Sequence, residues 1–137
     1  MTLAQQTQER FKGILPDLLG VQLVEVTPDR VLATLKVRPE LCTTGKILHG
    51  GTIMAFADTL GAIGTVVNMP QGYGTATIES KTNFVGGAAE GSTVTGETTP
   101  VHKGRSTQVW DAEVKSERSG KTIARFRCTQ MILRKRD

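Results

Sequence analysis

Residues 48–69 read LHGGTIMAFADTLGAIGTVVNM, and this stretch decides the fold because it is long and apolar almost throughout. Its large apolar side chains recur every three or four residues, which is the spacing of one buried helix face. That face consists of Ile53, Phe56, Leu60, Ile63 and Val67. The stretch therefore predicts one long helix over residues 51–67, ended by the helix-breaking Pro70.

Asp58 is the only acidic or basic residue in this stretch besides His49. An ionised carboxylate is costly to bury without partners, so an isolated one in an apolar helix indicates a functional group. The alternative is a solvated residue on the outside of the helix. Gly50-Gly51 is predicted to open the helix, where unpaired N–H groups can hold a developing oxyanion. A carboxylate and an N–H cradle on one element favour acyl chemistry, whereas His49 by itself is more typical of a loop or a cap.

The rest of the chain has the alternating pattern of β-strands, with three exceptions. Residues 3–12 predict a short amphipathic helix, and residues 16–20 and 39–48 predict connections. The two strands before the long helix are close enough to form a hairpin, and short glycine-containing turns separate the four strands after it. The predicted strands are residues 21–26, 31–38, 74–85, 93–103, 106–116 and 122–133.

These elements predict an α+β protein of one domain, residues 1–137, with an antiparallel sheet of about six strands wrapped round the central helix. The four strands after the helix are expected to form a meander, because connections this short join neighbouring antiparallel strands. The helix is apolar on most of its circumference, which indicates that a partner subunit covers part of it.

Composition argues against several classes of function. Only 4% of the residues are aromatic, and they do not alternate with basic residues, so no nucleic-acid partner is expected. The run Arg134-Lys135-Arg136 contributes to the net charge of +4, either as a solvated tail or as an attraction for an anionic ligand. Cys42 and Cys128 are isolated, and no Cys or His spacing indicates zinc or a disulfide framework, so no metal is expected. The N-terminus does not resemble a secretory signal, and Asp58 argues against a membrane span, so the protein is expected in the cytoplasm.

Three motifs together resemble the hotdog-fold acyl-CoA thioesterases, specifically the phenylacetate-degradation (PaaI-like) branch. The first is Leu48-His49-Gly50-Gly51 with Asp58 on the helix that follows. The second is His102-x-Gly104-Arg105-x-x-Gln108-Val109-Trp110, which is similar to the family's strand pair next to the coenzyme A site. The third is the run from Thr77-Ile78-Glu79 to Asn83-Phe84, which is similar to the family's third strand. The resemblance extends from about residue 15 to residue 133.

The resemblance implies a dimer with active sites at the subunit interface, commonly assembled further into a tetramer. It implies that Asp58 is the nucleophile or general base and that the Gly50 N–H polarises the thioester carbonyl, the two coming from different subunits. The His49 side chain is expected to hold the site loop or the departing thiolate. Thr77 occupies the position of a Ser or Thr that orients the water or the carboxylate. Coenzyme A is part of the substrate in this family, so no separate cofactor is expected.

Thr43 and the turn Lys103-Gly104-Arg105 are two further features of the implied site. Thr43 departs from the family pattern, because relatives commonly carry Asn or Gln six residues before the histidine. A hydroxyl is shorter than an amide and offers one donor instead of two, which changes the contacts to the thioester or the water. Lys103, Gly104 and Arg105 form a turn that is expected to hold the phosphates of coenzyme A, the alternative being ordinary turn charges.

The predicted function is hydrolysis of acyl-CoA thioesters, with aryl, arylacetyl or medium-chain acyl groups as the expected substrates. Attack by the Asp58 carboxylate and attack by an activated water both remain open. One alternative is a non-catalytic acyl-CoA sensor built on the same fold. A second is a hotdog hydratase or dehydratase, which moves water across a carbon–carbon double bond.

Overall fold

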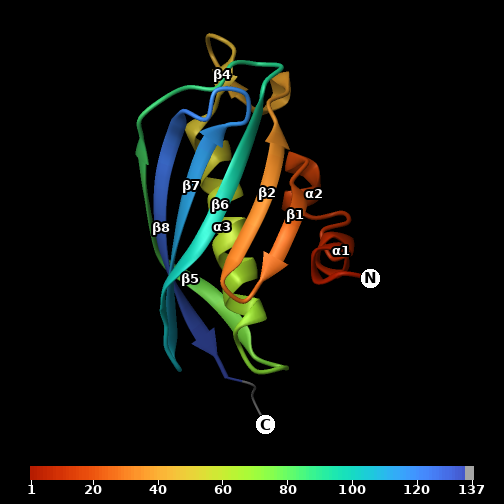
Figure 1. The fold of residues 1–137 in the computed structure, drawn as a ribbon, viewed down its shortest axis with the longest axis vertical. Helices are drawn as coiled ribbons and strands as arrows, with labels where there is room; N and C mark the ends of the chain where they lie inside the picture. The colour runs from red at the N-terminus through yellow and green to blue at the C-terminus, as the bar shows by residue number, and fades with distance from the viewer. Residues whose placement is uncertain (135–137) are drawn as a thin grey trace.

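The computed structural model describes residues 1–134, with helix α3 (Gly50–Val67) held in the concave side of a six-stranded sheet (Figure 1). All strand pairs in the sheet are antiparallel, and the strand order is β1-β2-β6-β7-β8-β5. The strands are β1 (Gln22–Thr27), β2 (Arg30–Lys36), β5 (Gly74–Phe84), β6 (Thr93–Lys103), β7 (Thr107–Ser116) and β8 (Thr122–Leu133). The predicted α+β fold is confirmed, while Lys135 and Arg136 of the predicted basic tail lie outside the described residues.

Helix α3 forms where the apolar periodicity predicted it, and it begins one residue earlier. Its predicted face is buried against the sheet at Ile53, Phe56, Leu60 and Ile63. By length and composition alone α3 would also suit a membrane span, but in this fold it contacts β2, β5, β6, β7 and β8 as a core helix.

Two glycines of α3 let the sheet come unusually close to the helix. A Cβ at Gly61 would lie 2.6 Å from Cys128 Sγ, and one at Gly64 would lie 2.8 Å from the Trp110 ring. Any larger residue at these positions would push β7 and β8 away from the helix. The close approach therefore fixes where side chains of β8 meet the middle of α3.

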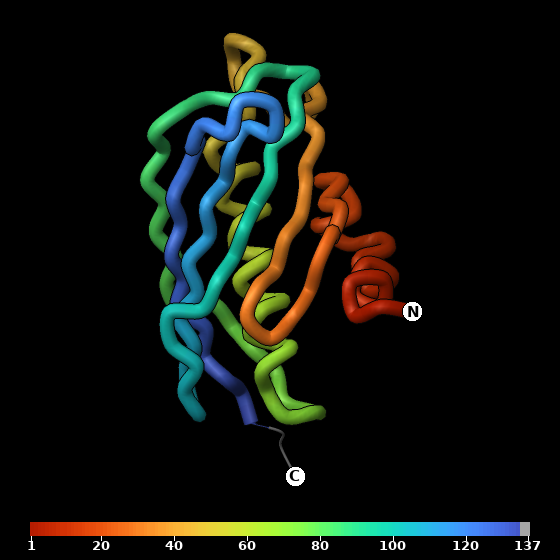
Figure 2. The backbone as a smooth tube through the Cα atoms, viewed as in Figure 1, coloured from red at the N-terminus to blue at the C-terminus, as the bar shows by residue number. Residues whose placement is uncertain are grey.

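Strand β5 does not follow the predicted meander. It pairs with β8, from Gly74↔Leu133 to Phe84↔Ala124, and not with β6, which follows it in the chain. Strand β6 pairs with β2 on one side and with β7 on the other, so β5 cannot pair with it. Residues 85–92 therefore cross the end of the sheet to reach β6 (Figure 2). The meander holds only for β6, β7 and β8, and β5 becomes an edge strand.

Two predicted connections contain more structure than expected. Residues 16–20 belong to helix α2 (Leu15–Leu19), because proline suits the first helical turn and Gly20 ends the helix at φ 83°. Residues 39–48 hold a 3₁₀ turn, η1 (Pro39–Leu41), and a small hairpin formed by β3 (Cys42–Thr43) and β4 (Ile47–Leu48). The N-terminal helix, α1 (Leu3–Glu9), is shorter than the predicted 3–12.

The two edges of the sheet differ in how they are covered. At the β1 edge, the Gln8 side chain of α1 donates to the Val21 carbonyl and accepts from the Leu23 N–H, both at 2.8 Å. These bonds occupy backbone groups that an additional strand would need. At the other edge, all but two of the residues of β5 are exposed. Strand β5 is therefore the open edge of the sheet.

Candidate active site

The start of α3 is organised around His49. Its Nδ1 accepts the Gly51 N–H at 2.7 Å, so the imidazole is the N-cap of the helix. A Cβ at Gly51 would lie 3.0 Å from this nitrogen, so glycine is what allows the ring to fold back over the helix end. In the neutral ring the proton is then on Nε2, where it can be donated to a ligand.

One backbone donor in the first turn of α3, the Gly50 N–H, is not used by this cap. The Thr52 and Ile53 N–H groups both donate to the His49 carbonyl, at 3.0 and 3.1 Å. Within residues 1–134, the Gly50 N–H has no acceptor. A free N–H at the positive end of a long helix is able to stabilise an oxyanion. The Phe84 ring borders this position, because a Cβ at Gly50 would lie 3.2 Å from it.

Asp58 is half-buried on the side of α3 that faces β5. Its Oδ1 accepts a hydrogen bond from the Thr77 hydroxyl at 2.8 Å. Thr77 in turn accepts a hydrogen bond from Gln130 Nε2 at 2.6 Å. The structure thus brings together Asp58 and Thr77, which the sequence had placed in one site, and adds Gln130, which the sequence analysis missed. The available signal was a polar residue in the inward-facing, otherwise apolar row of β8.

One chain does not bring Asp58 and the Gly50 N–H to the same reacting atom. They lie more than two turns apart on α3, which is about 12 Å along an axis that rises about 1.5 Å per residue. Attack on a carbonyl carbon and donation to its oxygen each require contact at about 3 Å. The carboxylate and N–H cradle expected on one element can therefore meet one thioester only if they come from different chains.

The predicted coenzyme A turn lies toward the other end of α3. Lys103, at the end of β6, forms an ion pair with Asp29 in the β1–β2 turn, with Nζ 2.6 Å from Oδ1. Gly104 leaves room for the His102 ring, which would be 2.5 Å from a Cβ there. Arg105 is exposed and forms no ion pair within the described part of the chain. Of the two cations in the turn, Arg105 is thus the one free to meet a phosphate.

Thr43 lies on the β3–β4 hairpin, opposite Ile47 and exposed. The hairpin directly precedes α3, so Thr43 is at the same end of the helix as Gly50. No hydrogen bond joins Thr43 to Asp58 within residues 1–134. A role for Thr43 in the site stays a prediction.

Cys128 is the other reactive type of side chain near Asp58. Burial is the main cause that raises the pKa of the Cys128 thiol, and the nearby Asp58 carboxylate raises it further. The thiol is therefore held in its neutral, poorly nucleophilic form. Among residues 1–134, no three His, Cys, Asp or Glu side chains are placed to hold a metal ion together.

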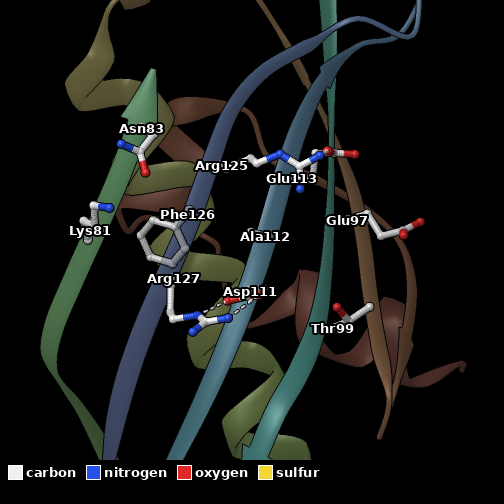
Figure 3. Close-up of a pocket in the computed structure, with 10 residues that line it drawn as sticks. All are labelled: Lys81, Asn83, Glu97, Thr99, Asp111, Ala112, Glu113, Arg125, Phe126 and Arg127. Carbon is white, nitrogen blue, oxygen red and sulfur yellow. Dashed lines mark hydrogen bonds and ion pairs between the residues drawn. The ribbon is translucent and has the colours of Figure 1, made fainter. Parts of the chain in front are cut away.

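A separate concavity of about 610 Å³ lies on the outer face of the sheet (Figure 3). Four of its charged side chains pair with one another: Arg127 binds Asp111 with Nε 2.6 Å from Oδ1, and Arg125 binds Glu113 at 2.7 Å. The hydrogen bond from Lys115, helped by the charge of Arg125, holds the pKa of the Glu113 carboxyl below its usual value. None of the predicted site residues lines this concavity, so it is not the candidate active site.

The sequence model of the Thioesterase superfamily matches this chain over residues 45–123, a range that contains His49, Asp58 and Thr77. A predicted esterase from Deinococcus radiodurans is 36% identical over 122 residues, which is 88% of this chain and 75% of the relative. The chain belongs to the thioesterase superfamily. The predicted enzyme class, a thioester hydrolase, is confirmed.

Solved structures agree with the fold of this thioesterase. A thioesterase from Pseudomonas aeruginosa gives a TM-score of 0.91 at 24% identity, covering 97% of this chain and 95% of that chain. The PaaI protein from the phenylacetic acid degradation operon of E. coli gives a TM-score of 0.85 at 22% identity, covering 98% of both. The predicted hotdog fold, which the PaaI protein shares, is confirmed.

Two further similar proteins are described with coenzyme A. A 1,4-dihydroxy-2-naphthoyl-CoA hydrolase from Listeria monocytogenes is 26% identical over 89% of this chain and 98% of its own. A Streptococcus mutans protein solved bound to acetyl CoA gives a TM-score of 0.76 at 23% identity, covering 85% of this chain and 91% of that chain. The compound named for each protein is a thioester of coenzyme A.

Proposed function

We propose that this thioesterase hydrolyses acyl-CoA thioesters, using Asp58 as nucleophile or general base and the Gly50 N–H as carbonyl polariser. The observation that carries the proposal is a carboxylate held by Thr77, together with a helix N-terminus whose Gly50 N–H is free within the described chain. The coenzyme A thioesters named for the Listeria and Streptococcus relatives support the substrate class.

The hydrogen bonds suggest how the reaction proceeds. Thr77 occupies Oδ1 of Asp58, which leaves Oδ2 to attack the carbonyl carbon or to accept a proton from water. The Gly50 N–H then bonds the carbonyl oxygen as it becomes negative, and one such donor is typically worth about 10²–10³ in rate. Collapse of the tetrahedral intermediate breaks the carbon–sulfur bond, and the coenzyme A thiolate leaves and takes up a proton. If water attacked, the free acid forms at once, and the proton that Asp58 accepted goes to the thiolate. If Oδ2 attacked, the product is an anhydride between Asp58 and the acyl group, and a water must hydrolyse it to release the acid and restore the carboxylate.

Both groups are combined in one site if β5 pairs with β5 of a second copy. Strand β5 is the open edge and exposes large apolar side chains at Ile78 and Phe84, and the exposed Val85 follows directly after the strand. In each chain Thr77 contacts Asp58, while Phe84 borders Gly50. In such an antiparallel pair, a two-fold axis passes between Thr77 and Phe84 and places the Phe84 end of one β5 strand beside the Thr77 end of the other. Gly50 of the partner subunit, which lies next to that Phe84 end, therefore approaches Asp58. We therefore propose a homodimer with two shared sites, which the family resemblance extends to a tetramer.

We propose an aryl, arylacetyl or medium-chain acyl group as the substrate's acyl part. The aromatic acyl group in the name of the Listeria relative supports this choice. Met54 lies one turn from Gly50 and one turn from Asp58, and it is 37% exposed. Its flexible thioether side chain offers apolar surface one turn from Asp58, where it can adapt to an acyl group.

The test is a panel of benzoyl-, phenylacetyl-, hexanoyl- and crotonyl-CoA, each followed with a thiol-reactive dye. A hydrolase releases free thiol, and we expect at least one of the first three to do so. Binding in a calorimeter without thiol release would instead indicate a sensor. Loss of the crotonyl double bond without thiol release would indicate a hydratase. The matched blank is Asp58→Asn, in which thiol release must disappear.

A further inference from the structure

We propose that Gln130 is a positioning residue that sets the direction of the Thr77 hydroxyl and thereby holds one oxygen of Asp58 in place. The inference rests on the proposed role of Asp58. Gln130 lies on β8 directly opposite Thr77 of β5 and is fully buried. It is therefore out of reach of a substrate and can act only through its neighbours.

Every polar atom of the Gln130 amide has a partner. Its Nε2 donates to Thr77 Oγ1 at 2.6 Å and approaches Cys128 Sγ at 3.5 Å. Its Oε1 lies 3.1 Å from the Thr75 hydroxyl, whose single proton is shared with the Met131 carbonyl at 3.0 Å. Burying an amide costs free energy unless it is hydrogen-bonded, and this one is bonded on both sides. The amide consequently lies with Nε2 toward Thr77 and Oε1 toward Thr75.

That orientation decides where the Thr77 proton points. An ionised carboxylate only accepts hydrogen bonds, so Thr77 must donate its single proton to Asp58 and accept from Gln130. A reversed amide would present Oε1 to Thr77 and compete with Asp58 for that proton. The Thr75 hydroxyl lies 3.1 Å from Oε1 and 3.0 Å from the Met131 carbonyl, so its single proton can reach either acceptor, and the orientation of the amide is set by its bond to Thr77. As a result, Gln130 donates to Thr77, and Thr77 donates to the Asp58 carboxylate.

The chain contains a matched control for burial and polarity. Gln108 is the direct partner of Gln130 across β7 and β8, and it is 1% exposed. Its Oε1 accepts from Trp110 Nε1 at 2.9 Å, and its Nε2 donates to the Thr65 carbonyl near the end of α3. Gln108 thus has an equally buried amide with similar bonds, but none of them reaches Thr77 or Asp58.

The test is a double-mutant cycle with Gln130→Met and Thr77→Val on the best acyl-CoA of the panel. We expect each variant to lower kcat about 10-fold with KM nearly unchanged, because a misplaced reacting group can cost up to about 10² in rate. The double variant should be no slower than Thr77→Val alone, because Gln130 acts through that hydroxyl. Gln108→Met should lower the thermal midpoint but leave kcat within about 2-fold, a stability effect without an effect on the barrier.

The inference would be overturned if the kcat losses of the two single variants multiplied in the double variant. It would also be overturned if Gln108→Met lowered kcat as much as Gln130→Met does. If Gln130→Met does not fold, Gln130→Glu keeps the volume, and its carboxyl can donate to Thr77 only when protonated. Its kcat relative to wild type should then fall as pH rises, and a flat ratio overturns the inference. A wild-type enzyme that releases no thiol from any acyl-CoA overturns the proposed function and this inference together. If the wild-type enzyme does release thiol but the kcat losses of Gln130→Met and Thr77→Val multiply in the double variant, only the inference about Gln130 is overturned and the proposed function stands.

Discussion

Two potentially reactive side chains meet beside Gly61, the Asp58 carboxylate on α3 and the Cys128 thiol on β8. The thiol is buried, and its raised pKa keeps it neutral. The carboxylate is only half-buried and has one oxygen engaged by Thr77. At the scale of single residues, Asp58 is therefore the better candidate for the attacking group of the proposed reaction, and Cys128 is its buried neighbour.

Asp58→Asn should abolish turnover while the fold is retained. The substitution keeps the size of the side chain but removes both the nucleophile and the base, and general base catalysis alone is worth about 10²–10⁴ in rate. Thiol release under saturating acyl-CoA measures the effect, and circular dichroism checks the fold. If more than about a tenth of the rate survives, a barrier change below about 1.4 kcal/mol, Asp58 is not the key group.

Arg105→Ala should weaken acyl-CoA more than the same acid carried on a short pantetheine thiol. The Arg105 charge is exposed, so loss of a phosphate contact raises KM only where a nucleotide is present. Lys103→Ala is the matched control from the same turn, because its ammonium is already paired with Asp29. Equal losses on both carriers would assign Arg105 a purely structural role.

At the scale of elements, the first turn of α3 divides its donors between two tasks. The imidazole of His49 uses the Gly51 N–H, and the His49 carbonyl uses the next two. The cap thus satisfies the backbone groups that the helix must satisfy and leaves the Gly50 N–H for a ligand. His49 consequently caps α3, and in the proposed site it would also keep the Gly50 N–H available to the substrate.

His49→Ala should lower the free energy of unfolding by about 0.5–2 kcal/mol, the usual cost of losing an N-cap side chain. His49→Asn provides the control, because asparagine is a good cap and should retain most of that stability. Urea denaturation of the three proteins measures the difference. A loss in kcat shared by both variants would show that His49 also acts on the substrate, whereas unchanged stability in His49→Ala would refute the capping role.

At the scale of the whole molecule, the sequence predicted the helix well and the strand order only in part. The periodicity from Ile53 to Val67 locates α3 because burial of one face is a local property of the chain. The position of β5 in the sheet depends instead on whether β2 or β5 pairs with the edge of β6. That choice is between strands far apart in the sequence, so a local sequence pattern does not predict it. The same limit applies to the site: the motif predicted Asp58 and Thr77, but the contact with Gln130 exists only once β5 lies on β8.

Shared sites predict that two inactive variants restore activity to each other. Gly50→Pro removes the N–H at the first helical position, where proline is well tolerated, and Asp58→Asn removes the carboxylate. In an equal mixture of re-associated subunits, half the dimers are mixed and each has one intact site, so activity should reach about a quarter of wild type. Gly50→Ala, which keeps the N–H but crowds the Phe84 ring, is the control for crowding. Mixed dimers that remain inactive would refute sites shared between subunits.

The Gln8 side chain, clamped across the backbone at the start of β1, has a consequence for how many copies can associate. A sheet with two usable edges can add strands from both sides without limit, as fibres do. In this sheet the β5 edge is open, whereas at the β1 edge Gln8 already bonds the Val21 carbonyl and the Leu23 N–H. If two copies join through β5 as proposed, both outer edges of the combined sheet are β1 edges with these groups occupied. A further strand would have to displace Gln8 there, so we expect strand addition to favour a pair over a fibre.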